Sequence, residues 1–136
     1  MLEIKDLSVK FGSRKVLDNV SFSLRPHRLT VLVGHNGSGK STLFNCVNQQ
    51  LPYTGTITEG EKDLALTPPR ERARAIAILP QTMPSPHITG RELVALGRNP
   101  YLDFTGRLRE KDRRAVEVAL ESLQGKESSS RLGSRT

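Results

Sequence analysis

Apolar and polar residues alternate in two segments near the start of the chain, and this alternation predicts β-strands. The first segment, residues 2–11, ends before Gly12, and the second, residues 16–25, ends before Pro26. In a strand successive side chains point to opposite faces, so alternation gives one apolar face. We therefore predict two strands, each with one face buried.

Two other segments are apolar almost without interruption. Residues 29–33 and residues 75–79 are short, β-branched-rich runs that stop at Gly34 and Pro80. A strand covered on both faces has this composition, which is typical of parallel sheets. The pattern predicts two central strands of a parallel sheet, and residues 54–58 a further short strand.

Helical spacing of apolar residues predicts three helices, over residues 40–51, 91–98 and 110–123. Before the second of them, Thr89 and Glu92 have the spacing of a capping box, in which both side chains bond amides at a helix start. The last residues, 124–136, are polar except for Leu132. We predict that this tail is disordered or non-native.

A glycine-rich loop lies between the first apolar run and the first helix. It matches G-x-x-x-x-G-K-[ST] at every fixed position, with the residues Gly34, His35, Asn36, Gly37, Ser38, Gly39, Lys40 and Ser41. Its glycines let the backbone curl so that successive amides converge on one anion. The strand before it and the helix after it are the context that a phosphate-binding loop requires.

The residues at the end of the loop supply the remaining chemistry. A helix N-terminus favours phosphate oxygens through its dipole and free amides. Lys40 adds a mobile positive charge for the β and γ phosphates, the Ser41 hydroxyl can bind Mg²⁺, and Thr42 can donate to the α phosphate. We predict a nucleotide-phosphate site over residues 34–42.

Composition limits the other functions. The net charge is +7, but the basic clusters are interleaved with Asp or Glu, and the chain has two Tyr, four Phe and no Trp. Stacking platforms for single-stranded nucleic acid are therefore scarce, and we predict no nucleic-acid partner. The single cysteine, Cys46, excludes an internal disulfide. No signal peptide or run of roughly 20 apolar residues is found, so we expect a cytoplasmic chain.

The surroundings of the loop resemble the ATP-binding subunit of an ABC transporter. The segments that carry the resemblance are "VKFG" at 9–12, the loop itself and "AIAILPQ" at 75–81. The resemblance implies an α/β fold, a P-loop NTPase domain of the ABC type with N-terminal antiparallel strands. It further implies that Phe11 stacks on adenine, that Val16 supports the base, and that Gln81 acts near Mg²⁺ and the γ phosphate.

A later segment narrows the resemblance. "ITGRELVALGRNPYL" at 88–102 is similar to the start of the helical subdomain in importers of iron-siderophore complexes, haem and cobalamin. This resemblance implies integral-membrane permease subunits, a substrate-binding protein and a homodimer of ATP-binding subunits as partners. It also implies a position on the inner face of the cell membrane, held there by the permease.

The resemblance covers residues 1–123, with core strands and loop over 1–82 and the start of the helical subdomain over 83–123. No segment of the LSGGQ type, no strand ending in Asp-Glu and no downstream switch histidine is found in the sequence. We therefore expect the N-terminal part of such a domain, truncated or frame-shifted. This chain is expected to bind MgATP and to hydrolyse it slowly or not at all.

Two other classes stay open at this point. A small P-loop phosphotransferase or GTPase would share the loop, although no Asn-Lys-x-Asp segment for guanine is present. A non-catalytic basic module that binds nucleotide is the second alternative.

Overall fold

The computed structural model describes residues 1–79 and 87–131, with side chains as far as residue 123. The chain divides into two compact units, Met1–Ile78 and Leu79–Thr136. The predicted border between the core and the helical subdomain, at residues 82 and 83, lies outside the described residues. None of the helices in the described parts is long and apolar enough to cross a membrane.

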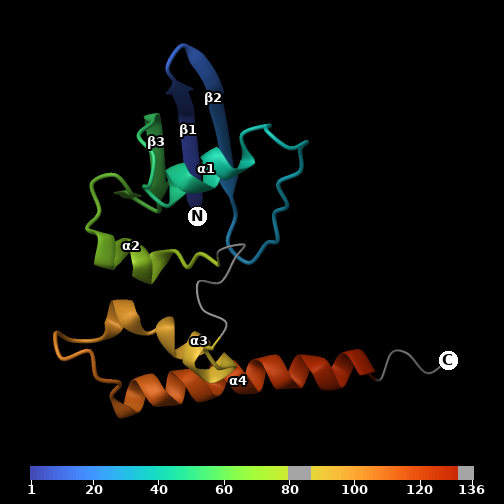
Figure 1. The fold of residues 1–136 in the computed structure, drawn as a ribbon, viewed down its shortest axis with the longest axis vertical. Coiled ribbons are helices and arrows are strands. Elements are labelled where there is room, and N and C mark those ends of the chain that lie inside the picture. The colour runs from blue at the N-terminus through green and yellow to red at the C-terminus, as the bar shows by residue number, and fades with distance from the viewer. Residues whose placement is uncertain (80–86, 132–136) are drawn as a thin grey trace. The chain divides into compact units, whose positions relative to one another are not determined.

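The first unit is built on an antiparallel sheet (Figure 1). Its strands lie in the order β2-β1-β3-β4, and every neighbouring pair is antiparallel. The bounds are β1 Leu2–Phe11, β2 Arg14–Leu24, β3 Thr54–Glu59 and β4 Lys62–Asp63. The strands predicted at 2–11, 16–25 and 54–58 are thus confirmed, and β2 begins two residues earlier than the alternation indicated.

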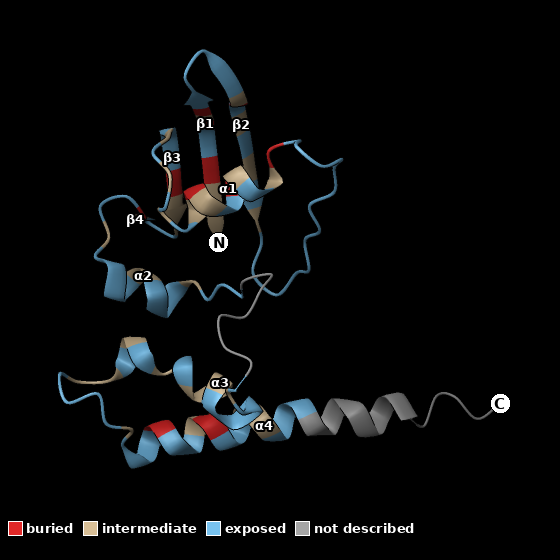
Figure 2. Ribbon diagram, in the orientation of Figure 1, coloured by how far each residue is buried: buried red, intermediate tan, exposed pale blue. Residues whose placement is uncertain are grey.

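Helix α1, Lys40–Val47, packs on one face of this sheet and closes the core. Within this first unit, Figure 2 shows most of the buried positions on β1, β3 and α1. The buried apolar residues of the cluster are Ile4, Leu7, Val9, Leu17, Leu43, Cys46, Ile57 and Leu64. Burial of this apolar surface is the main favourable term that holds the unit together. The helix predicted over 40–51 is confirmed but ends at Val47.

The prediction of a parallel sheet around the two apolar runs is wrong for this structure. Residues 29–33 form no strand, and Leu29 is 92% exposed. In the second run, Ala75 is the last residue of helix α2, Pro69–Ala75, and residues 76–79 form neither helix nor strand. A parallel strand needs a hydrogen-bonding neighbour reached through a long crossover, whereas hairpins pair locally. No strand in the described residues pairs with either run.

The second unit holds α3, Gly90–Leu96, a short 3₁₀ helix, Asn99–Tyr101, and α4, Glu110–Arg131. The capping box predicted at the start of α3 is confirmed. The Glu92 amide donates to the Thr89 hydroxyl at 3.2 Å, and the Thr89 amide donates to the Glu92 carboxylate at 2.7 Å. The hydrogen bond between the Thr89 hydroxyl and the Glu92 carboxylate is the main reason that the pKa of Glu92 lies below its ordinary value. The helix start is thus fixed by local sequence.

Charged pairs join α3 and its following turn to α4. Arg98 donates to the buried carboxylate of Asp112 through Nε at 3.0 Å and a terminal nitrogen at 2.8 Å. These bonds are the main reason that the pKa of Asp112 is lowered. A second pair joins Arg91 to Glu117. The helix predicted over 110–123 is confirmed.

Helix α4 also continues beyond its predicted end, to Arg131. The backbone is thus helical over residues 124–131, where the sequence predicted a disordered or non-native tail, and residues 132–136 lie outside the described residues. Adding residues to a helix that has already formed costs far less than starting one, so a polar sequence can extend it.

Candidate functional site

The glycine-rich loop runs directly into α1 and is held by local hydrogen bonds. The Ser38 amide donates to the His35 carbonyl at 3.2 Å, and the Leu43 amide donates to the Gly39 carbonyl at 2.9 Å. Gly39 is the residue before the helix and has a φ of 94°, a left-handed conformation that favours glycine. No side chain caps this helix start. The first amides of α1 are therefore available to an external acceptor.

The loop also packs closely against strand β2. A Cβ on Gly39 would lie 2.9 Å from the Leu17 side chain and 3.2 Å from the Val16 carbonyl. Within the loop, a Cβ on Gly34 would lie 2.5 Å from the Ser38 hydroxyl. A side chain at position 34 would displace the Ser38 hydroxyl, whereas at Gly39 the positive φ and the contact with the Val16 carbonyl both favour glycine and fix the start of α1 against the sheet.

Lys40 folds back over the loop that precedes it. Its Nζ donates to the carbonyl oxygens of Gly34 at 2.5 Å and His35 at 2.7 Å, and to the Ser38 hydroxyl at 3.2 Å. The ammonium group thus sits at the centre of the turn. An anion bound there would meet a positive charge that the protein has already positioned.

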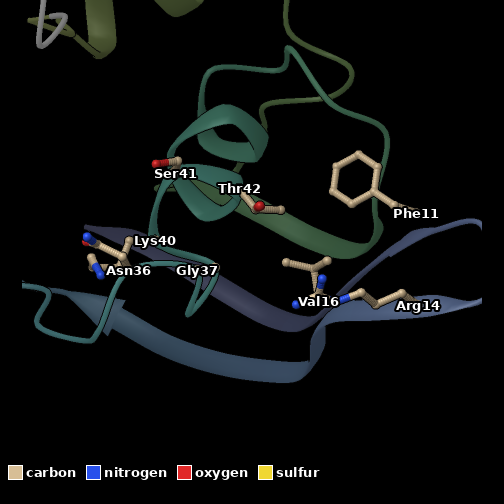
Figure 3. A pocket seen from close by; sticks show the side chains of 9 residues that line it. Phe11, Arg14, Val16, Asn36, Gly37, Lys40, Ser41 and Thr42 are labelled. Carbon is tan, nitrogen blue, oxygen red and sulfur yellow. The ribbon is translucent and has the colours of Figure 1, made fainter.

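A pocket of ≈ 450 Å³ opens beside the loop, between α1 and the hairpin formed by β1 and β2 (Figure 3). This volume is within the range of small-ligand sites. Nine residues line it: Phe11, Arg14, Val16, Asn36, Gly37, Gly39, Lys40, Ser41 and Thr42. Most of the residues predicted for the nucleotide site are therefore brought together in one place.

Three loop residues predicted for the site do not line the pocket but shape it. Gly34, His35 and Ser38 supply the acceptors for Lys40 described above. The His35 ring is exposed and its Nδ1 bonds the Asn36 carbonyl at 2.9 Å. The remaining predicted residue, Gln81, lies outside the described residues, so its role stays a prediction.

The hairpin supplies the apolar side of the pocket. Phe11 ends β1 with its side chain half exposed, and Val16 lies on β2. An aromatic ring at 50% exposure next to a pocket has a free face on which a flat ligand can stack. Both residues thus lie in the same pocket as the loop, and their roles toward adenine stay predictions.

Sequence reasoning missed one residue of the pocket, Arg14. The signal was available, because Phe11 and Arg14 are separated by a two-residue turn and pair directly across the hairpin. Residues directly opposite each other in an antiparallel pair have side chains on the same face. A residue opposite a stacking aromatic is therefore a candidate for the same ligand.

The charges of the pocket match a polyphosphate. Its lining carries two cations, Arg14 and Lys40, and no carboxylate. The hydroxyls of Ser41 and Thr42 and the amides at the helix start add neutral donors. This donor set fits the phosphates of a nucleotide, and the Ser41 hydroxyl is an oxygen ligand of the kind that Mg²⁺ accepts.

The side of α1 that faces the sheet carries the thiol of Cys46, which is not a phosphate-binding group. Cys46 is fully buried against the sheet, and burial raises the pKa of its thiol. A buried neutral thiol is a packing group. The reactive face of α1 is thus the one toward the pocket.

Comparison with known proteins identifies the family of this chain. Residues 17–136 match the family described as ABC transporter. The chain is 45% identical over 98 residues to the hemin import ATP-binding protein HmuV of Chelativorans sp. (strain BNC1), covering 71% of this chain and 38% of that protein. It is 33% identical over 122 residues to the iron(3+)-hydroxamate import ATP-binding protein FhuC of Bacillus subtilis (strain 168), covering 88% and 45%.

A third relative is the achromobactin transport ATP-binding protein CbrD of Dickeya dadantii (strain 3937), with 35% identity over 118 residues, 85% of this chain and 44% of that protein. The protein is therefore a P-loop NTPase domain, and the chain belongs to the ABC transporter family. The chain spans less than half the length of these relatives.

Proposed function

We propose that this chain is the nucleotide-binding part of the ATP-binding subunit of an ABC importer. The observation that carries the proposal is the pocket that joins the phosphate loop to Phe11 and Val16. Its two ends suit the two ends of ATP, an aromatic and apolar end for adenine and a cationic, amide-rich end for the phosphates. Family membership favours this function over a phosphotransferase, a GTPase or a basic binding module.

The proposed roles follow the chemistry of each group. Lys40 binds the β and γ phosphates, and its position within the loop means that it needs little reorganisation when nucleotide enters. Thr42 donates to the α phosphate, and Ser41 supplies one oxygen to Mg²⁺. Gln81 remains the predicted contact to the metal and the γ phosphate. The metal would neutralise phosphate charge, which is its usual contribution to phosphoryl transfer.

Titration of the chain with ATP tests the site. We expect wild-type protein to bind ATP and Lys40→Ala to lose roughly tenfold or more in affinity, because a charge-assisted contact is removed. Lys62→Ala is the matched control, since Lys62 is an exposed lysine of the same unit outside the pocket. Equal affinities for wild type and Lys40→Ala would contradict the proposal.

We propose ATP hydrolysis coupled to import as the activity of the subunit to which this chain corresponds. The relatives named for hemin, iron(3+)-hydroxamate and achromobactin transport support uptake of an iron complex, such as a ferric siderophore, as the class of cargo. Radioactive iron uptake by cells with and without the gene tests this, with haemin and a ferric hydroxamate in separate arms. Unchanged uptake in both arms would exclude these cargoes.

The proposed partners are permease subunits in the membrane, an external substrate-binding protein and a second ATP-binding subunit. The subunit would then be cytoplasmic and held on the inner face of the membrane through the permease. The importer names of the relatives support this arrangement. Fractionation of cells with and without the permease genes tests it, because loss of the permease should release the subunit from the membrane fraction.

A further inference from the structure

The pocket contains a second cation that the function proposed above does not use. Arg14 begins β2, is exposed and lines the pocket together with Phe11 and Val16. In Figure 3 its side chain extends from the hairpin toward Val16. We propose that the Arg14 guanidinium binds a phosphate oxygen of the nucleotide, as a second cationic ligand beside Lys40. This inference rests on the proposed nucleotide site and adds a residue to it.

The register of the hairpin directs Arg14 into the pocket. Arg14 is paired with Phe11 across the turn, so the two side chains share a face of the sheet. Val16, two residues along β2, lies at the register shift between the pairs Lys10–Lys15 and Val9–Leu17, and it lines the same pocket. All three residues line the pocket, and the intervening Lys15 does not.

Arg14 also lies close along β2 to the place where this strand touches the loop. The place where β2 touches the loop is Val16, whose carbonyl would be 3.2 Å from a Cβ on Gly39. Arg14 is two positions before Val16 on β2, which corresponds to about 7 Å of extended backbone. A long side chain that turns toward Val16 therefore approaches the start of α1, where the phosphates are expected.

The charge of Arg14 has no partner in the part of the chain that the structure describes. Within residues 1–79 and 87–131 its guanidinium makes no hydrogen bond or ion pair. Its neighbour Lys15, on the opposite face, is bonded to Asp18 at 2.8 Å. Because no carboxylate lines the pocket, an anionic ligand would be the counter-charge of this guanidinium. Guanidinium pairs well with phosphate because its planar donors can bind two oxygens at once.

Competition binding with a fluorescent ATP analogue tests the inference, using ATP and inorganic tripolyphosphate as the two competitors. Arg14→Gln should weaken the binding of ATP and of tripolyphosphate by about five- to tenfold, because one charge-assisted contact is lost. Arg14→Lys should recover part of the loss, since it keeps the charge but not the planar fork. Lys15→Gln removes the same charge one residue away and should stay within about twofold of wild type.

Other results of this competition experiment would overturn either the role of Arg14 or the proposed function. If Arg14→Gln weakens ATP but not tripolyphosphate, the guanidinium contacts the base or ribose and the inference is wrong. If Arg14→Gln and Lys15→Gln have equal effects, the contribution is general charge and the inference is also wrong. If wild-type protein binds neither competitor, or Lys40→Ala binds both like wild type, the proposed function itself fails. Matching circular dichroism spectra of the variants exclude misfolding as the cause.

Discussion

The phosphate loop and the apolar run that precedes it are adjacent in the chain but differ in what holds them. The loop is fixed by bonds between residues a few positions apart, such as Lys40 Nζ to the Gly34 and His35 carbonyls. The apolar run, residues 29–33, pairs with none of the described strands and leaves Leu29 and Val33 exposed at 92% and 83%. The phosphate loop is thus held by its own local hydrogen bonds, whereas residues 29–33 are not held by strand pairing within the described residues.

This difference separates local from non-local structure. Closing a turn of a few residues costs little entropy and is repaid at once by nearby hydrogen bonds. A parallel strand gains its bonds only when distant parts of the chain supply neighbours. The loop can therefore have its binding geometry in this chain while the adjacent run stays unpaired. Four predictions test this contrast, from the largest expected effect to the smallest.

Gly39→Ala should have the largest effect on ATP binding, because it distorts the loop itself. The substitution combines a φ of 94° with a Cβ only 2.9 Å from the Leu17 side chain. Strain and overpacking should move the loop out of its binding geometry and so weaken ATP binding by about 100-fold. Gly60→Ala is the control, since Gly60 has a φ of 60° but no atom within 4 Å of its Cβ. It should lower stability slightly and leave ATP affinity unchanged in the same titration.

Ile57→Ala should follow, because it opens the core beneath α1. Ile57 is fully buried on β3 and belongs to the cluster that includes Leu43 and Cys46. Removing a buried Ile side chain typically costs about 2–5 kcal/mol in the free energy of unfolding. Urea unfolding of both proteins measures the difference. A cost below about 1 kcal/mol would mean that this core is not packed as described.

Acidification should weaken the second unit by an intermediate amount. Arg98 holds the pKa of Asp112 below its ordinary value of 3.8, so the ion pair stabilises the fold above that pH. Its contribution is lost as the pH falls through the lowered pKa. Melting of α3 and α4 followed by circular dichroism should move to lower temperature below about pH 4. Asp112→Asn should melt several degrees lower at neutral pH and lose part of this pH dependence.

Leu29→Asp should have the smallest effect, although it places a charge in the most apolar segment before the loop. Because Leu29 is 92% exposed, the change should alter the free energy of unfolding by less than about 0.5 kcal/mol. Urea unfolding beside Ile57→Ala gives the direct contrast. A cost comparable to that of Ile57→Ala would show that residues 29–33 are buried after all.

The features that the sequence predicted correctly are those whose signals are local. Helix α1, the hairpin strands and the Thr89–Glu92 capping box each depend on residues close together in the chain. The pocket also gathers most of the residues predicted for the nucleotide, and their roles stay predictions. The parallel strands depended on pairing that the described residues do not provide. Arg14 was missed because its role depends on hairpin register, although the two-residue turn after Phe11 made that register readable. The end of α4 was misplaced because a polar composition does not by itself stop a helix.

The most direct test of the nucleotide site is nuclear magnetic resonance of the backbone amides during titration with MgATP. The account predicts that the amides of Gly37, Gly39, Lys40, Ser41 and Thr42 shift together and saturate, while those of the strand β4 do not. The same titration on Lys40→Ala should leave them nearly unchanged. Loop amides that stay in place in the wild-type protein, or that shift equally in both proteins, would contradict phosphate binding at this loop.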